Sequence, residues 1–98
     1  MKSDNLIQLS GFLTKDVITN EKKSFAAFTI GRKVGEETMY MSCIAFPSQK
    51  FKIPFDILAK GNEVFVAGYI RPNNYTKDGV KHCSIQLVAE KIREIDEN

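Results

Sequence analysis

Apolar and polar residues alternate along most of this chain, with few interruptions. Alternation with a period of two is typical of β-strands that bury one face and expose the other. The segments that alternate most clearly, which we predict to be strands, are residues 6–14, 24–32, 38–46, 62–71 and 80–95. The pattern therefore predicts an all-β protein with five strands.

In three of these strands we expect one face to lie in the core, namely Ile7, Leu9 and Leu13, then Val64, Val66 and Ile70, and finally Ile85, Leu87 and Ala89. In the second strand Ala26, Phe28 and Ile30 form one face, and Phe25, Ala27 and Thr29 form the other. In the third strand, 38–46, both faces are mostly apolar, so one of them must be covered or form a binding surface.

The period changes between the third and fourth strands. Phe51, Phe55 and Leu58 lie at helix-like spacing, and a stop signal follows at Gly61, so we predict a short helix over 54–60. Five strands with a short helix between the third and fourth describe an oligonucleotide-binding (OB) barrel. A plain five-stranded sandwich is the alternative, but closure is favoured because it hides the strand edges.

Length and charge are consistent with one small domain over residues 1–98. The net charge is +2, and four acidic residues against two basic ones in 90–98 leave +4 on the rest of the chain. This mild basic bias is compatible with a polyanionic partner. A stretch resembling a signal peptide or a membrane span is missing from the sequence, so we expect a cytoplasmic protein that does not enter membranes.

The sequence offers no chemistry of the kind that enzymes use. Cys43 and Cys83 lack metal-type spacing, the adjacent His82 does not create one, and both thiols are expected to be reduced and buried. We find no paired carboxylates, no nucleophile–base pair and no glycine loop for phosphates. We therefore expect no catalytic residue, no metal and no cofactor, and a function in binding.

The most informative stretch follows the fourth strand. Turn-forming residues over 72–79 predict a polar arm with its tip at Asp78-Gly79. The arm carries one aromatic residue, Tyr75, without an apolar neighbour, and Arg71 and Lys77 flank it. An aromatic residue on a basic finger can stack on a base while a cation holds a phosphate. The alternative is that Tyr75 folds back onto the sheet.

The residue order of the whole chain, over roughly 5–90, resembles the bacterial single-stranded DNA-binding protein family. The segments that carry the resemblance are N-L-I-Q-L-S-G-F-L-T-K-D at 5–16, S-F-A-A-F-T-I at 24–30, T-M-Y-M-S-C-I-A-F at 38–46 and K-G-N-E-V-F-V-A-G-Y-I-R at 60–71. Tyr75 falls where the family's arm carries an aromatic residue. The family's linker and its acidic, Phe-ending tail have no counterpart here, so we expect no C-terminal acidic tail and no recruitment of partners through one.

The resemblance implies an OB-fold that binds single-stranded DNA without sequence preference, in replication, recombination or repair. It places base stacking on Tyr40, Phe46 and Tyr75. It places basic contacts on Arg71 and on Lys33, Lys50, Lys60 and His82, to which the arm's own Lys77 is added. Because the chain has no Trp, stacking falls to Tyr and Phe.

Outward-facing apolar residues indicate an oligomer. Leu6 and Phe12 in the first strand, and Phe65 and Tyr69 in the fourth, lie on the parity opposite to the core and are expected to form the interface. We expect a homotetramer, as the resemblance implies, with a dimer as the alternative. Two other functions stay open: a dimeric replication-restart accessory of the primosomal type, which also docks on replication proteins, and an OB module that binds only protein.

Overall fold

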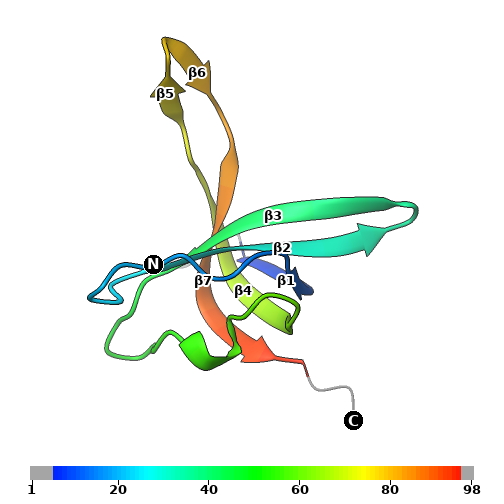
Figure 1. Cartoon of the computed structure of the whole chain (residues 1–98), viewed down its shortest axis with the longest axis vertical. Coiled ribbons are helices and arrows are strands. Elements are labelled where there is room, and N and C mark those ends of the chain that lie inside the picture. The colour runs from blue at the N-terminus through cyan, green and yellow to red at the C-terminus, as the bar shows by residue number, and fades with distance from the viewer. Residues whose placement is uncertain (1–5, 96–98) are drawn as a thin grey trace.

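Five long strands close into a barrel in the computed structural model, which describes residues 6–95 (Figure 1). The barrel strands are β1 (Leu6–Leu13), β2 (Ala26–Val34), β3 (Glu37–Ala45), β4 (Glu63–Pro72) and β7 (Ile85–Glu94), in the order β1-β2-β3-β7-β4. A separate hairpin is formed by β5 (Tyr75–Lys77) and β6 (Val80–His82). The predicted all-β, five-stranded OB barrel is thus confirmed.

Closure follows from two pairings that join distant parts of the chain. β1 pairs with β4 in antiparallel fashion, and β3 pairs with β7 in parallel. Every barrel strand therefore has a neighbour on each side, although β1 meets β2 only at Phe12 and Leu13. Within the described residues, no helix is long and apolar enough to cross a membrane.

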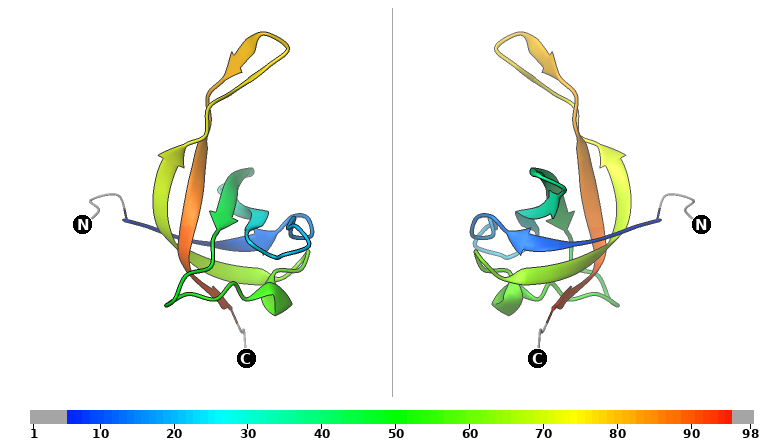
Figure 2. Two further views of the ribbon diagram at one scale, coloured as in Figure 1. Left: turned by 90° about the vertical axis from the view of Figure 1, so that its left-hand side faces the viewer. Right: turned by 90° about the vertical axis from the view of Figure 1, so that its right-hand side faces the viewer.

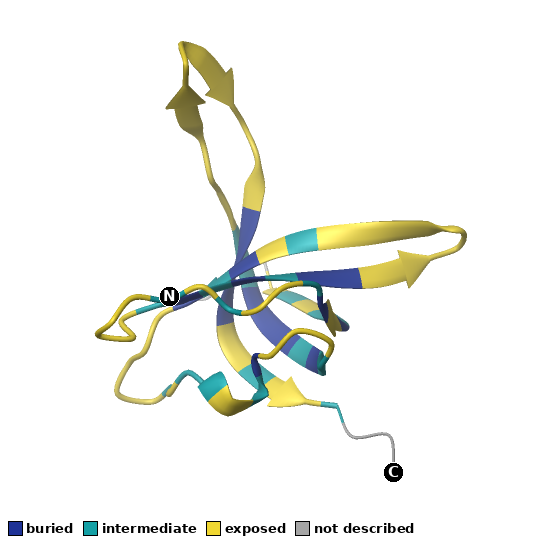
Figure 3. Cartoon of the chain, in the orientation of Figure 1, coloured by how far each residue is buried: buried dark blue, intermediate teal, exposed yellow. Residues whose placement is uncertain are grey.

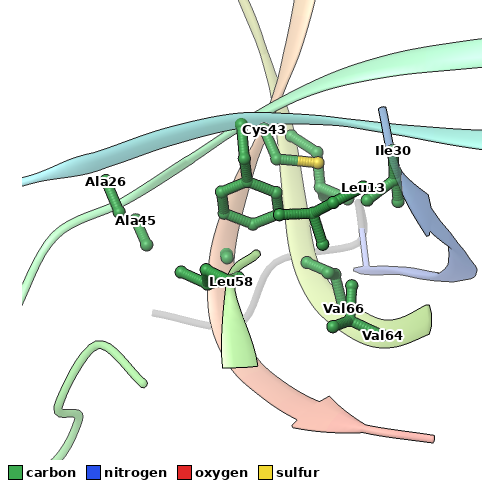
Figure 4. Packing of buried hydrophobic residues seen from close by; sticks show 11 residues of the cluster. Leu13, Ala26, Ile30, Cys43, Ala45, Leu58, Val64 and Val66 are labelled. Carbon is green, nitrogen blue, oxygen red and sulfur yellow. The ribbon is translucent and has the colours of Figure 1, made fainter. Parts of the chain in front are cut away.

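The core fills the barrel interior with residues of the predicted inward parity (Figure 4). Leu13, Ile30, Val64 and Leu87 are each at most 2% exposed, and Leu58 inserts into the same cluster from outside the sheet. Burying a Leu, Ile or Val side chain contributes about 1.5–3 kcal/mol. This interior is the main source of stability, and it leaves the outer faces of the strands available for binding.

The helix predicted over 54–60 is wrong, because only a single 3-10 turn, η1 (Phe55–Ile57), forms there. A helix would need the backbone N–H groups at its end to donate within the segment. Instead, the N–H of Lys60 donates to Asp16 Oδ1 (3.2 Å) and the N–H of Gly61 donates to the Leu13 carbonyl (2.8 Å). These bonds tie the segment to the end of β1 and replace helical bonds.

The charged segment 32–37 belongs to a hairpin ribbon formed by β2 and β3. β2 and β3 pair as far as Val34 and Glu37, which leaves Gly35 and Glu36 as the turn. Gly35 has φ 67°, a conformation that glycine adopts without strain. Residues 32–40 are all exposed, and the ribbon projects from the barrel (Figures 1 and 3). The sequence of this segment does not alternate between apolar and polar residues, because a two-stranded ribbon in solvent has no buried face.

The long strand predicted over 80–95 is interrupted between β6 and β7. At this point Asn73 and Ser84 exchange two hydrogen bonds, from the Asn73 N–H to the Ser84 carbonyl (2.8 Å) and from Ser84 Oγ to the Asn73 carbonyl (3.0 Å). The bonds close the base of the β5–β6 arm, which projects away from the barrel (Figure 2). Ile85 lies beside this base and is 53% exposed, so its predicted core position is wrong.

β7 contains a bulge that shifts its inward parity. The pairing with β4 passes from Lys91 opposite Ala67 to Ala89 opposite Gly68, which leaves Glu90 as the extra residue. After the bulge Ile92 packs against the core, although simple alternation would have pointed Lys91 inward. The close approach of β4 to β7 at the bulge requires a glycine, since a Cβ on Gly68 would lie 1.8 Å from the Val88 carbonyl oxygen.

The two cysteines have different environments. Cys43 is fully buried in the core, and burial raises the pKa of its thiol to about 12. Cys83 is exposed beside the arm, so the expectation of two buried thiols is wrong for Cys83. The break between β6 and β7 places Cys83 in solvent.

Candidate nucleic-acid interface

The first cluster of candidate residues lies on the outer wall of the barrel. Arg71 and Gln86 are opposite one another in β4 and β7, and Gln86 Oε1 accepts hydrogen bonds from Arg71 Nε (3.4 Å) and Nη2 (3.2 Å). The Arg71 guanidinium carbon is 5.7 Å from the centre of the Phe46 ring, within cation–π range. Phe46 is 43% exposed. We call Phe46, Arg71 and Lys50 the wall cluster.

A groove of about 420 Å³ adjoins the wall cluster. Phe46, Phe51, Tyr69 and Val88 supply apolar walls, and Lys50 adds a cation. A concave surface that combines apolar walls with a few polar groups suits a flat, partly polar ligand such as a nucleobase. Lys50 is thus placed where it could meet the backbone of a strand held on Phe46.

The second cluster lies on the outer face of the β2–β3 ribbon. Tyr40 shares this face with Phe46, since the two are six residues apart in sequence, or about 20 Å along an extended strand. Tyr40 is 64% exposed and lies over its partner Gly31, where a Cβ would be 3.4 Å from the Tyr40 ring. Lys33 lies on the same face of β2, two residues beyond Gly31. We call Tyr40 and Lys33 the ribbon cluster.

The third cluster lies on the β5–β6 arm. Tyr75 and His82 are a cross-strand pair, and their rings stack with centroids 4.9 Å apart and planes 9° apart. Tyr75 therefore has a local partner, which sequence reasoning did not foresee, and it does not fold back onto the sheet. The predicted tip is confirmed, because Asp78 and Gly79 form the two-residue turn with positive φ. Tyr75, His82 and the exposed Lys77 form the arm cluster.

Lys60 lies at the opposite end of β4 from Arg71, between η1 and β4. Its backbone N–H donates to Asp16 Oδ1, and the N–H of the next residue, Gly61, donates to the Leu13 carbonyl. Lys60 is therefore tied to the end of β1, and its candidate role does not involve the Arg71 end of β4.

Comparison with known proteins decides the family. The model of the single-strand binding protein family matches residues 4–95. The chain belongs to the single-strand binding protein family. No curated protein sequence matches it closely enough to count as a relative.

Solved structures of this family share the fold. The mitochondrial single-stranded DNA-binding protein Rim1 of S. cerevisiae superposes with a TM-score of 0.74 at 15% identity, covering 98% of this chain and 100% of Rim1. The Plasmodium falciparum single-strand binding protein, solved in complex with single-stranded DNA, gives the same TM-score and identity and covers 98% of each chain. At this identity the likeness shows the fold alone.

The residues expected at the oligomer interface lie on a shared outer face of β1 and β4, where Leu6 pairs with Tyr69. Leu6 and Phe12 are 63% and 50% exposed. Phe65 and Tyr69 are only partly exposed, since the Arg93 guanidinium lies 4.7 Å from the Phe65 ring centre and Tyr69 lines the groove. Phe65 and Tyr69 do lie on the predicted outward parity of β4, and their role in an interface stays a prediction.

Sequence reasoning missed Gln86. It is only 8% exposed, yet it lies on the outward parity of β7 and bonds to Arg71. Its sequence neighbours are apolar, so nothing nearby marks it as part of a site. Only the pairing of β4 with β7 places it opposite Arg71. Within residues 6–95, no group of three or more His, Cys, Asp or Glu could hold a metal ion.

Proposed function

We propose that this protein binds single-stranded DNA without sequence preference, by stacking bases on aromatic side chains and by holding phosphates with neighbouring cations. The observation that carries the proposal is the pairing of each exposed aromatic candidate with a cation. Phe46 is accompanied by Arg71, Tyr40 by Lys33, and Tyr75 by Lys77 on the same strand. Membership in the single-strand binding family supports the same function.

Stacking is expected to supply most of the affinity. Each base stacked on an aromatic side chain contributes about 1–3 kcal/mol. Three such contacts could supply several kcal/mol, whereas a chain with a net charge of +2 offers only a modest electrostatic attraction. Because every base has a flat face, stacking selects single strands over duplexes without selecting a sequence.

The cations are proposed to hold the backbone between the stacked bases. If four to six phosphates are contacted, log K should fall with log salt with a slope of about −3 to −4, at about −0.7 for each contact on a single strand. The test is a fluorescence anisotropy titration with labelled dT oligomers of several lengths at two or more salt concentrations. Duplex DNA of equal length is the control and should bind much more weakly. Equal affinity for both would contradict stacking and leave only a weak basic patch.

We further propose that the protein acts as a homo-oligomer, with a tetramer favoured, and that it works by binding and not by catalysis. The exposed side chains of Leu6 and Phe12 support an interface on the outer face of β1. Exposed apolar rows of this kind usually mark contacts between subunits. A role in replication, recombination or repair follows from single-strand binding itself, since these processes expose single strands.

A further inference from the structure

Gln86 is a polar residue in a position that favours an apolar one. It lies on the outward parity of β7, where Val88, two residues further along, is 6% exposed with a purely apolar side chain. Burying an amide without hydrogen bonds is costly, so a buried Gln needs a partner. Among the described residues that partner is Arg71, which reaches the Gln86 Oε1 with two of its nitrogens.

We propose that Gln86 is a positioning residue that holds the Arg71 guanidinium beside Phe46 and directs its remaining N–H groups toward a DNA phosphate. The inference rests on the proposed function and assigns to it a residue that does not itself touch the DNA. Arginine has several N–H donors, and the bonds to Gln86 use only part of them. Arg71 is an exposed residue, so a ligand can approach it from solvent.

A Gln at position 86 differs from a Glu in its effect on the charge of Arg71. A glutamate at this position would orient Arg71 equally well, but it would neutralise the charge that a phosphate needs. Gln86 accepts the same hydrogen bonds without a charge. No carboxylate within residues 6–95 forms an ion pair with Arg71, whose contacts are with Gln86 and Phe46. Gln86 therefore holds the guanidinium before DNA binds, and no carboxylate of the described residues competes with a phosphate for it.

Ordering before binding has a measurable consequence. A long side chain that must be fixed on binding costs affinity, and a side chain that is already fixed avoids this cost. Gln86→Met keeps the length of the side chain but removes the acceptor, so Arg71 should become mobile. Binding of a dT oligomer should then weaken by about two- to tenfold, with an unchanged salt slope, because Arg71 can still reach a phosphate.

Gln86→Glu should act differently. Its carboxylate would pair with Arg71, so binding should weaken more than in Gln86→Met and the salt slope should become shallower by about 0.7, the value of one phosphate contact. Gln8→Met is the control. Gln8 is exposed on β1 and pairs with Ala67, so the same substitution there removes no contact with Arg71. Because Gln8 lies on the outer face of β1, where the oligomer interface is proposed, the mass of this variant in solution is measured first, and at unchanged mass its affinity should be unchanged.

A double-mutant cycle decides whether Gln86 acts through Arg71. In the Arg71→Ala background, Gln86→Met should change affinity by less than about twofold, since the group that it positions is gone. An equal loss in both backgrounds would overturn the proposal and make Gln86 a structural residue of the wall. If the wild-type protein binds no single strand at all, the proposed function fails, which is a different result from a wild type that binds and shows no coupling.

NMR on the wild-type protein provides a test that needs no folded variant at position 86. The chain has three arginines, and Arg32 on the exposed ribbon serves as the mobile reference. The Arg71 Nε–H should show a higher order parameter than that of Arg32, with Arg71→Lys used to assign the signal. Equal mobility of the two side chains would overturn the proposal.

Discussion

Replacing Tyr75 with Ala should separate the binding role of the arm from the stability of the barrel. Tyr75 is 51% exposed, and its ring stacks on that of His82 with 4.9 Å between centroids. Losing such a pair costs about 0.5–1.5 kcal/mol, but the loss falls on the arm, which can open without the barrel. The barrel's melting temperature should therefore fall by less than about 4 °C, corresponding to less than 1 kcal/mol.

The same change should weaken binding far more than it affects stability. One lost base stack is worth about 1–3 kcal/mol, which is a 5- to 150-fold loss of affinity for a dT oligomer. Anisotropy titration measures the affinity, and circular dichroism measures the melting temperature. Val80→Ala is the control, because Val80 is on the same arm, is 56% exposed and is not aromatic. A large drop in melting temperature with intact affinity, or an equal loss of affinity in Val80→Ala, would refute the reasoning.

Four further results are expected. Gly68→Ala should destabilise the barrel by about 1–3 kcal/mol or more, measured by urea unfolding, because its Cβ would lie 1.8 Å from the Val88 carbonyl oxygen; an unchanged midpoint would count against the bulge. A thiol reagent should label Cys83 rapidly and Cys43 only after unfolding, and equal rates would contradict the burial of Cys43. The pKa of the Cys43 thiol is near its ordinary value of 9.0 in the unfolded chain and about 12 in the folded one, so its contribution to stability is complete below pH 9. Between pH 9 and pH 12 the free energy of unfolding should fall by about 1.4 kcal/mol per pH unit because of this group, and Cys43→Ala should not show that fall. Light scattering should give a mass well above the 11.1 kDa of one chain, and Leu6→Glu should lower it without unfolding the barrel; a wild-type mass near 11.1 kDa would exclude the proposed oligomer.

Much of the fold could be predicted from alternation alone. Ala26, Phe28 and Ile30 recur with period two, and all three are buried, as a strand with one face in the core requires. The turn at Asp78-Gly79 was predictable because positive φ angles at both positions suit this pair. These features depend on residues that are neighbours in sequence, so their physics is local.

The helix predicted over 54–60 does not form because the segment bonds to a distant part of the chain. The Lys60 N–H donates to the Asp16 side chain and the Gly61 N–H donates to the Leu13 carbonyl at the end of β1, both more than forty residues earlier, and these bonds compete with helical ones. Only the approach of the two segments in space makes those acceptors available. The bulge at Glu90 has the same origin, since it depends on the fit of β7 against Gly68.

The sequence by itself determined that this chain forms strands, which face of most of them is apolar, and which aromatic and basic residues are candidates for holding a nucleic acid. Tertiary structure decided how those candidates are grouped. It placed Lys60 at the opposite end of β4 from Arg71, stacked Tyr75 on His82, and placed Gln86 opposite Arg71. Alternation reports only whether a side chain points inward or outward. Which outward side chains meet depends on strand order and register, and these are fixed by barrel closure between segments far apart in the chain.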